Sequence, residues 1–146
     1  VTALGRTDAG FFALHAGAQI RLWPDVMAHL SLNAQQASLV HPAYPKRNWQ
    51  VERRPMQVGT PLKRVYILSP DDAIDFVPLA AEAAFLHLLP HYYLSRWPQV
   101  LDTSDQHLHN VSALVQGVDV YRFHYPRDLT QLDEAVKRLI QHQTTG

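Results

Sequence analysis

The stretch "LKRVYILS", Leu62 to Ser69, carries the strongest strand signal in this sequence. Its centre, "VYIL", is an unbroken run of β-branched, aromatic and aliphatic residues, whereas a strand with one solvent-exposed face alternates apolar and polar residues. We therefore expect a strand that is covered on both faces and that needs a neighbouring strand on each side. An apolar strand edge left unpaired would be an aggregation hazard.

Further elements are predicted on both sides of this strand from the period of the apolar residues. They are strands at 11–14, 19–23, 74–77 and 118–125, the first two joined by a turn around Gly17, and helices starting at Pro24 and covering about 79–89 and 103–117. Residues 33–48, which are polar and contain two prolines, are predicted to form an ordered surface loop. This order of elements predicts a mixed α/β layer fold.

A last helix is predicted after Asp128, which has the residue type of an N-terminal cap. Its apolar residues recur at helical spacing, so we expect them to face the core. They are Leu129, Leu132, Val136, Leu139 and Ile140.

The composition restricts the compartment and the partners. The length of 146 residues suits one domain spanning 1–146. Lysine plus arginine and aspartate plus glutamate both number 13, so no net field draws the whole chain to nucleic acid or to a membrane surface. The sequence has no cysteine, which excludes disulfides and thiolate sites and is compatible with the cytoplasm. No apolar run approaches the ~20 residues of a membrane span. We predict neither a nucleic-acid nor a membrane partner.

The histidines and paired carboxylates do not identify an enzyme by themselves. None of the nine histidines has the spacing of a zinc motif, so we predict no metal site. Asp71 and Asp72 follow the "VYIL" strand, where catalytic acids often lie in α/β sheets. The same "SPDD" segment is also a common turn sequence, and both interpretations stay open.

Positive charge is concentrated in one part of the chain. Six basic residues fall within about twenty positions, and they suggest either a solvated surface or a site for phosphate or an acidic peptide. They are Lys46, Arg47, Arg53, Arg54, Lys63 and Arg64. The pair Lys46 and Arg47 follows "HPAYP", so we expect it on a loop stiffened by Pro42 and Pro45.

Four phrases together resemble a known family. "HAGAQIRLWPDV", "YPKRNWQV", "PLKRVYIL" and "VDVYRFHYPRDLTQLDEAV" occur in the order and at the spacing of the C-terminal half of proteins related to HPr kinase/phosphorylase. The nearest branch is the short bacterial HPr-kinase-like serine kinases. The resemblance covers nearly the whole chain, from Val1 to about His142.

This resemblance implies the C-terminal part of a P-loop kinase-like core, in an incomplete domain. Relatives use ATP and Mg²⁺, held by a Walker-type loop and an acidic pair, and the opening "VTAL" resembles the residues that directly follow that pair. The chain would then lack the phosphate loop and would supply the second wall of the site. Lys46, Arg47 and Arg21 would contact phosphate or the acceptor, which would be an HPr-like protein or a precursor peptide. Relatives often form rings or dimers.

Two functions are therefore expected. The first is part of an ATP-dependent protein or peptide serine kinase, in which residues 1–146 alone would be inactive and would self-associate. The second is a catalytically inactive binding or scaffold module derived from that family. A phosphopeptide-binding domain unrelated to kinases is a third reading, which rests on the basic segment alone.

Overall fold

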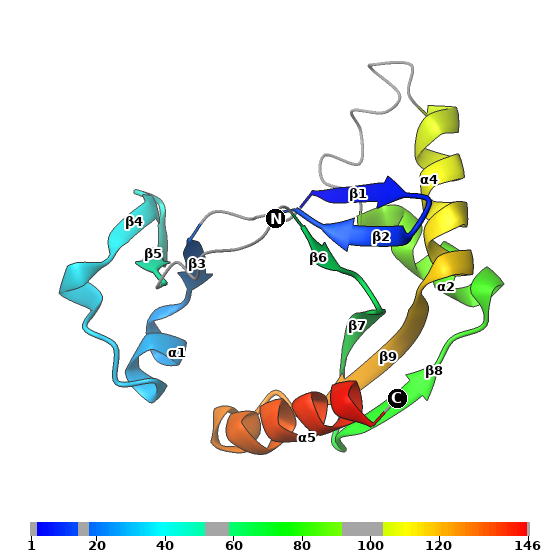
Figure 1. The fold of residues 1–146 in the computed structure, drawn as a ribbon. Helices are drawn as coiled ribbons and strands as arrows, with labels where there is room; N and C mark the ends of the chain where they lie inside the picture. Colours follow the sequence, from blue (N-terminus) through cyan, green and yellow to red (C-terminus); the bar gives the residue numbers. More distant parts are fainter. Residues whose placement is uncertain (1–2, 15–17, 52–58, 92–103, 146) are drawn as a thin grey trace. The chain divides into compact units, whose positions relative to one another are not determined.

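The computed structural model describes residues 3–14, 18–51, 59–91 and 104–145. These residues belong to two compact units (Figure 1). Unit 1 comprises Val1–Leu14 and Gly59–Gly146, and unit 2 comprises His15–Val58. Each unit is described by itself, and the single domain expected from the length stays a prediction.

The main sheet of unit 1 has the strand order β7-β9-β8. β7 (Arg64–Pro70) runs parallel to β9 (Asp119–Tyr125), and β8 (Asp75–Pro78) pairs antiparallel with the other side of β9. β9 is the best-buried strand because Val120 and Phe123 are almost fully covered. The predicted strands at 62–69, 74–77 and 118–125 are thus confirmed to within a few residues.

Helices cover both faces of this sheet. Successive strand residues point to opposite faces, and the in-register residues Tyr66 and Tyr121 both contact His142 of α5 (Leu132–Thr144). On the opposite face, Arg122 is hydrogen-bonded to His87 of α2 (Ala81–Leu88). α4 (Ser104–Gly117) packs against α2 and β9. Unit 1 therefore has helix, sheet and helix layers, which confirms the mixed α/β class.

Two short helical turns complete this layer arrangement. The 3-10 turn η2 (Leu89–His91) extends α2, and η3 (Leu129–Gln131) leads into α5. The carboxylate of Asp128 accepts a hydrogen bond from the Thr130 backbone N–H at 2.9 Å, so Asp128 caps η3. The predicted cap is thus confirmed for this turn and not for α5, whose N-cap residue is Gln131. The predicted start of α4 at Thr103 lies outside the described residues.

A second, smaller sheet of unit 1 has the order β1-β2-β6. β1 (Leu4–Thr7) and β2 (Gly10–Ala13) form a hairpin, and β6 (Thr60–Pro61) pairs with the free side of β2. β2 matches the strand predicted at 11–14. β1 was not predicted, because "LGRT" has neither alternation nor a run of apolar residues. The predicted turn around Gly17 lies outside the described residues.

Unit 2 holds a third sheet, of order β3-β5-β4, with one short helix. Its elements are β3 (Gln19–Leu22), α1 (Pro24–His29), the 3-10 turn η1 (Ala34–Gln36), β4 (Ser38–His41) and β5 (Tyr44–Gln50). α1 packs against β5 and buries Met27, which is 1% exposed. The prediction of β3 and of a helix starting at Pro24 is confirmed.

The prediction of a surface loop over 33–48 is wrong. β4 and β5 form an antiparallel hairpin there, with the turn at Pro42 and Ala43. Pro45 is compatible with β5 because it lies beyond the part paired with β3 and beside an irregularity in the β4 register. A proline has no N–H for a ladder, and such a position does not require one.

Two predictions of burial are also wrong. β7 is not covered on both faces, because Leu68 is 63% exposed. It also lacks the expected neighbour on each side, because in the described sheet it pairs only with β9. In α5, Val136 and Ile140 are exposed, whereas Ala135 is buried and His142 is half-buried. The small Ala135 and a hydrogen-bonding histidine suit the polar aromatic surface of the sheet better than the branched side chains do.

His142 lies in a cluster of aromatic rings that joins α5 to the sheet. Its ring stacks on Phe76 at 4.3 Å, and its Nδ1 lies 2.8 Å from the Tyr66 hydroxyl oxygen. Arg64 donates a hydrogen bond to the His142 backbone carbonyl. These contacts satisfy polar groups of the last turn of α5, where carbonyls lack helical partners.

Tyr66→Phe is expected to lower the free energy of unfolding by about 1 kcal/mol, because it removes the part-buried hydroxyl contact with His142 and leaves the ring in place. Urea denaturation followed by circular dichroism measures this change. Tyr44→Phe is the control, since Tyr44 is 60% exposed and its hydroxyl group is accessible to water. Equal stability of the two variants would contradict a structural role for this hydrogen bond.

Candidate anion-binding face of unit 2

One face of the β3-β5-β4 sheet is lined by polar and basic side chains. Ser38 of β4 and Arg21 of β3 both lie opposite Asn48 of β5, so the three form a row across the sheet. Lys46 lies two residues from Asn48 on the same face, diagonal to Arg21. Trp23, two residues after Arg21, comes on the same face. We call the surface formed by Arg21, Trp23, Ser38, Lys46 and Asn48 the basic face.

Lys46 is held on this face by an aromatic ring. Its Nζ lies 5.1 Å from the centroid of the Trp23 ring, within the range of a cation–π contact. Trp23 directly follows β3, and its neighbour Leu22 pairs with Arg47, so Trp23 comes beside Lys46 when the register is continued by one residue. Lys46 is half-buried, whereas Arg21 is exposed. The ammonium group thus has a defined position on the sheet.

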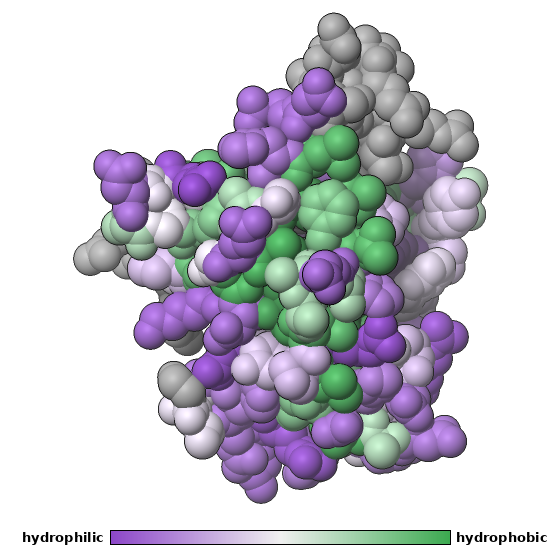
Figure 2. Space-filling view, turned by 90° about the vertical axis from the view of Figure 1, so that its right-hand side faces the viewer, coloured by the Kyte–Doolittle hydropathy of each residue, from purple (hydrophilic) through white to green (hydrophobic). Residues whose placement is uncertain are grey.

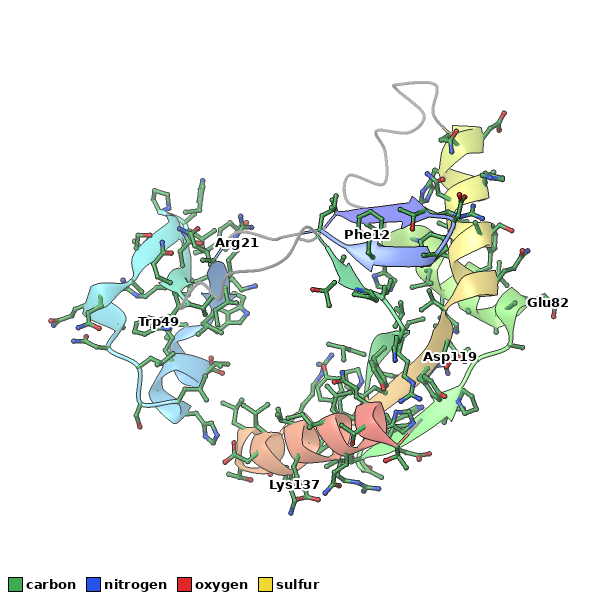
Figure 3. All side chains as sticks on the ribbon, in the orientation of Figure 1. Phe12, Arg21, Trp49, Glu82, Asp119 and Lys137 are labelled. Atoms are coloured by element: carbon green, nitrogen blue, oxygen red, sulfur yellow. The ribbon has the colours of Figure 1, made fainter. Side chains whose placement is uncertain are left out.

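Arg47 points to the other face of the sheet. It lies in register between Leu22 and Leu39, and its Nη1 donates a hydrogen bond to the Ala37 carbonyl at 3.0 Å. Trp49, two residues further along β5, lies on the same face as Arg47. β5 is the strand next to β3, which carries Arg21 (Figure 3). The structure therefore brings Arg21 and Lys46 together and separates Arg47 from them. In this position Arg47 links β5 to the residue that precedes β4.

The charge around the basic face is one-sided. Residues 18–51 contain three cationic side chains, Arg21, Lys46 and Arg47, and one carboxylate, Asp25. Asp25 lies in the first turn of α1, where a negative charge is favoured by the helix dipole. No ion pair involves Arg21 or Lys46 within the part of the chain that the structure describes. An anion would therefore meet two positive groups that are not ion-paired with Asp25, the carboxylate of residues 18–51.

The remaining basic residues of the predicted cluster lie elsewhere. Arg64 in unit 1 is used structurally, with an ion pair to Asp119 at 3.8 Å and its guanidinium 5.9 Å from the Tyr121 ring. Lys63 is exposed just before β7. Arg53 and Arg54 lie outside the described residues. The six residues that are close in sequence are thus divided between two units.

Asp71 lies at the carboxyl end of the parallel strands of unit 1. Its Oδ2 is 2.8 Å from Nδ1 of His124, and its Oδ1 accepts a hydrogen bond from the Asp72 N–H at 2.7 Å. The second contact is a local bond to the next residue in the chain, whereas the first joins Asp71 to a histidine of β9. Both interpretations of "SPDD" therefore stay open, and Asp72 is exposed.

Two hollows open on unit 1. One of about 890 Å³ is lined by residues before β7 and at the end of α4, among them Lys63, Gln116 and Asp119. Another of about 640 Å³ lies between the β1-β2 hairpin and α4, with Arg6 and Asp8 in its wall. The first is at the amino ends of β7 and β9, whereas ligands in α/β sheets bind at the carboxyl ends. The first hollow includes Lys63 and Arg64 of the basic segment, but neither hollow includes Lys46, Arg47 or Arg21.

The space-filling surface of unit 1 also has apolar areas, and the face turned to the viewer in Figure 2 shows hydrophobic residues gathered at its centre. Exposed hydrophobic side chains of this unit include Leu68, Leu86 and Ile140. Among residues 3–14, 18–51, 59–91 and 104–145, no helix is long and apolar enough to cross a membrane. In the same ranges, no three histidine, aspartate or glutamate side chains are placed to bind one metal ion.

Comparisons with known proteins give no relative. A scan against protein-family models, a search of curated proteins and a search of solved structures found no match for this chain. The resemblance to HPr-kinase-like proteins therefore stays a prediction from the four sequence phrases.

Proposed function

We propose that this chain supplies the acceptor-facing and phosphate-facing half of an ATP-dependent protein or peptide serine kinase of the HPr-kinase-like type. The observation that carries the proposal is the basic face, where Arg21 and Lys46 lie on one side of a sheet without a carboxylate partner in the described residues. Such a kinase transfers the γ-phosphoryl group of ATP to a serine hydroxyl and releases ADP and a proton.

The basic face has the chemistry that this role requires. Phosphoryl transfer is catalysed largely by positioning and by neutralising the charge on the phosphate oxygens. Arg21 offers a guanidinium fork for two oxygens, and Lys46 adds a point charge. The Asn48 amide and the Ser38 hydroxyl, in the same row, add neutral donors. In the proposal, these groups hold the phosphate or an acidic segment of the HPr-like protein or precursor peptide.

The described residues do not fit ATP and Mg²⁺. The sequence has no G-x-x-x-x-G-K-[ST] loop for nucleotide phosphates, and the described residues have no group of metal ligands. We therefore assign nucleotide and metal binding to another part of the complete kinase, which the resemblance places before "VTAL". No step of the reaction is assigned to ATP or Mg²⁺ on residues of this chain.

Calorimetric titration with Mg·ATP tests the proposal on two lengths of protein. Residues 1–146 are expected to bind it weakly or not at all, while the chain with its natural upstream segment should bind it and phosphorylate serine. Reading the coding DNA before Val1 should accordingly reveal a G-K-[ST] loop followed by an acidic pair. A stop codon directly before Val1, or a longer chain that does not bind nucleotide, would overturn the kinase proposal.

A second titration, with an acidic peptide, distinguishes the inactive binding or scaffold module. In that case, both lengths would bind an acidic peptide with equal affinity, and nucleotide would have no effect. Arg21→Ala would weaken peptide binding whichever of the two functions is correct. It therefore tests whether the peptide binds to the basic face, and it does not test which function the chain has.

A further inference from the structure

β7 has one unpaired edge in the described part of the sheet. It pairs with β9 on one side, and no other described strand adjoins its opposite side. The Lys63 carbonyl accepts from the Asp119 N–H at 3.3 Å, and the Asp71 N–H donates to the Tyr125 carbonyl at 2.9 Å. In a parallel ladder, alternate residues of a strand bond to one neighbour. The odd-numbered residues of β7 thus face β9, and the backbone groups of the even-numbered residues face the free edge.

The middle of this edge lacks the features that usually prevent strand pairing. Such features are short length, charge, proline or a bulge. β8, at the opposite edge, has four residues with Asp75 first and Pro78 last. β7 also begins with a charged residue, Arg64, and ends with a proline, Pro70, but it is longer, and its five central residues, Val65 to Ser69, include neither a charge nor a proline. Leu68 is 63% exposed on this strand. The edge is therefore well suited to accept another strand.

We propose that β7 pairs antiparallel with β7 of a second copy, about a two-fold axis through Ile67. In this register Tyr66 lies opposite Leu68 of the other copy, and Arg64 lies opposite Pro70. The outward-facing N–H and C=O groups of Tyr66 and Leu68 then meet, as an antiparallel hydrogen-bonded pair requires. The axis at Ile67 brings the whole length of β7 into register, although Pro70 has no N–H to donate to Arg64 of the other copy. It does not rest on the proposed kinase function.

The charges at the two ends of β7 favour this register. Lys63 precedes the strand and Asp71 follows it. Rotation about Ile67 places each Lys63 opposite Asp71 of the other copy, and the symmetry repeats the pair at the other end. Opposite charges facing each other across strands are stabilising, and like charges are destabilising. A register shifted by two residues would lose these pairs.

The same pairing covers exposed apolar surface. The exposed Leu68 side chain lies on the face that also carries Tyr66, so it would pack beside the Tyr66 ring of the second copy. On the other face, the two half-buried Ile67 side chains would meet at the axis. The partner that fits the edge is thus the chain itself.

A thiol introduced at Ile67 tests the axis directly, since the sequence has no cysteine. Ile67 would form a non-hydrogen-bonded pair with itself, with Cα atoms ~4.5 Å apart. This distance is within the range for a disulfide. Full-length Ile67→Cys is therefore expected to become mostly covalent dimer under mild oxidation, as measured by non-reducing electrophoresis.

Val65→Cys is the matched control, because it has the same face and half-buried class but lies opposite Ser69. When oxidised alone, Val65→Cys should form no covalent dimer on non-reducing electrophoresis. When mixed with Ser69→Cys and oxidised, it should form a covalent dimer. Equal cross-linking of Val65→Cys and Ile67→Cys, or no cross-linking of Ile67→Cys, would overturn the proposal.

A second measurement does not depend on thiols. Leu68→Lys places a charge on the edge and should weaken dimerisation about tenfold in sedimentation equilibrium. Val77→Lys is the control, since Val77 is an exposed hydrophobic residue of β8, at the other edge of the sheet. Equal dissociation constants for Leu68→Lys and the unmodified chain would contradict pairing through β7.

Discussion

Gly59→Ala is expected to lower the free energy of unfolding of unit 1 by roughly 2–5 kcal/mol, which combines backbone strain with overpacking. The φ angle of Gly59 is +111°, a conformation that residues with a Cβ rarely adopt. A Cβ at this position would lie 2.5 Å from Cδ2 of Phe12. The backbone strain and the overpacking arise at the same residue, so relieving one of them would not relieve the other.

The Phe12 ring has little room to move away. It belongs to the central strand β2, and a Cβ at Gly5 on the neighbouring β1 would lie 2.3 Å from its Cζ (Figure 3). The ring therefore covers glycines on both sides of β2. An aromatic ring over a cross-strand glycine compensates for the missing side chain and fixes the strand register. Gly5 and Gly59 are required because they leave space for this ring.

Gly10→Ala is the matched control for strain alone. Gly10 has φ +119°, but no atom lies within 4 Å of the position of its Cβ. We expect it to cost about 1–2 kcal/mol in thermal or urea denaturation. In a Phe12→Ala background, Gly59→Ala should fall to the same cost, because the clash is removed. If Gly59→Ala cost no more than Gly10→Ala in the unmodified chain, the packing of Phe12 against Gly59 would be contradicted.

The sequence predicted the elements whose signal is local and missed those that depend on pairing. β9, α4 and α5 have strong apolar periods and were found with nearly correct bounds. The β4–β5 hairpin was missed because Pro42, Pro45 and several polar residues resemble a loop. Only the pairing with β3 and β4 shows that Pro45 needs no ladder hydrogen bond. The packing of Phe12 over Gly5 and Gly59 also depends on contacts between strands, so it was not predicted from the sequence.

The candidate site was also predicted in part. Arg21 and Lys46 were singled out as basic residues, and the register places them on one face. Arg47 was grouped with Lys46 because the two are adjacent, as expected for a loop. On a strand, adjacent side chains point to opposite faces. The location on β5 therefore divides a pair that the sequence alone treats as one group, and the cation–π contact between Lys46 and Trp23 was not predicted.

Lys46→Ala is expected to slow phosphate transfer by the proposed complete kinase on the order of 10²-fold, if the ammonium contacts the phosphate that is transferred. The expected change is mainly in kcat, because the charge on the transferring group is met in the transition state. Lys46→Arg should retain much of the rate, since it keeps both the charge and a group able to contact Trp23. Steady-state kinetics with a serine-containing acceptor peptide measures both variants.

Arg47→Ala should behave differently, because Arg47 binds the Ala37 carbonyl on the opposite face. We expect it to lower stability and to change kcat little at a temperature where the protein is folded. Lys137→Ala, an exposed lysine of α5 labelled in Figure 3, is the control for loss of a positive charge. If Lys46→Ala and Lys137→Ala had the same rate, the basic face would be a solvated surface. If Arg47→Ala alone lost the rate, phosphate would lie on the opposite face of the sheet.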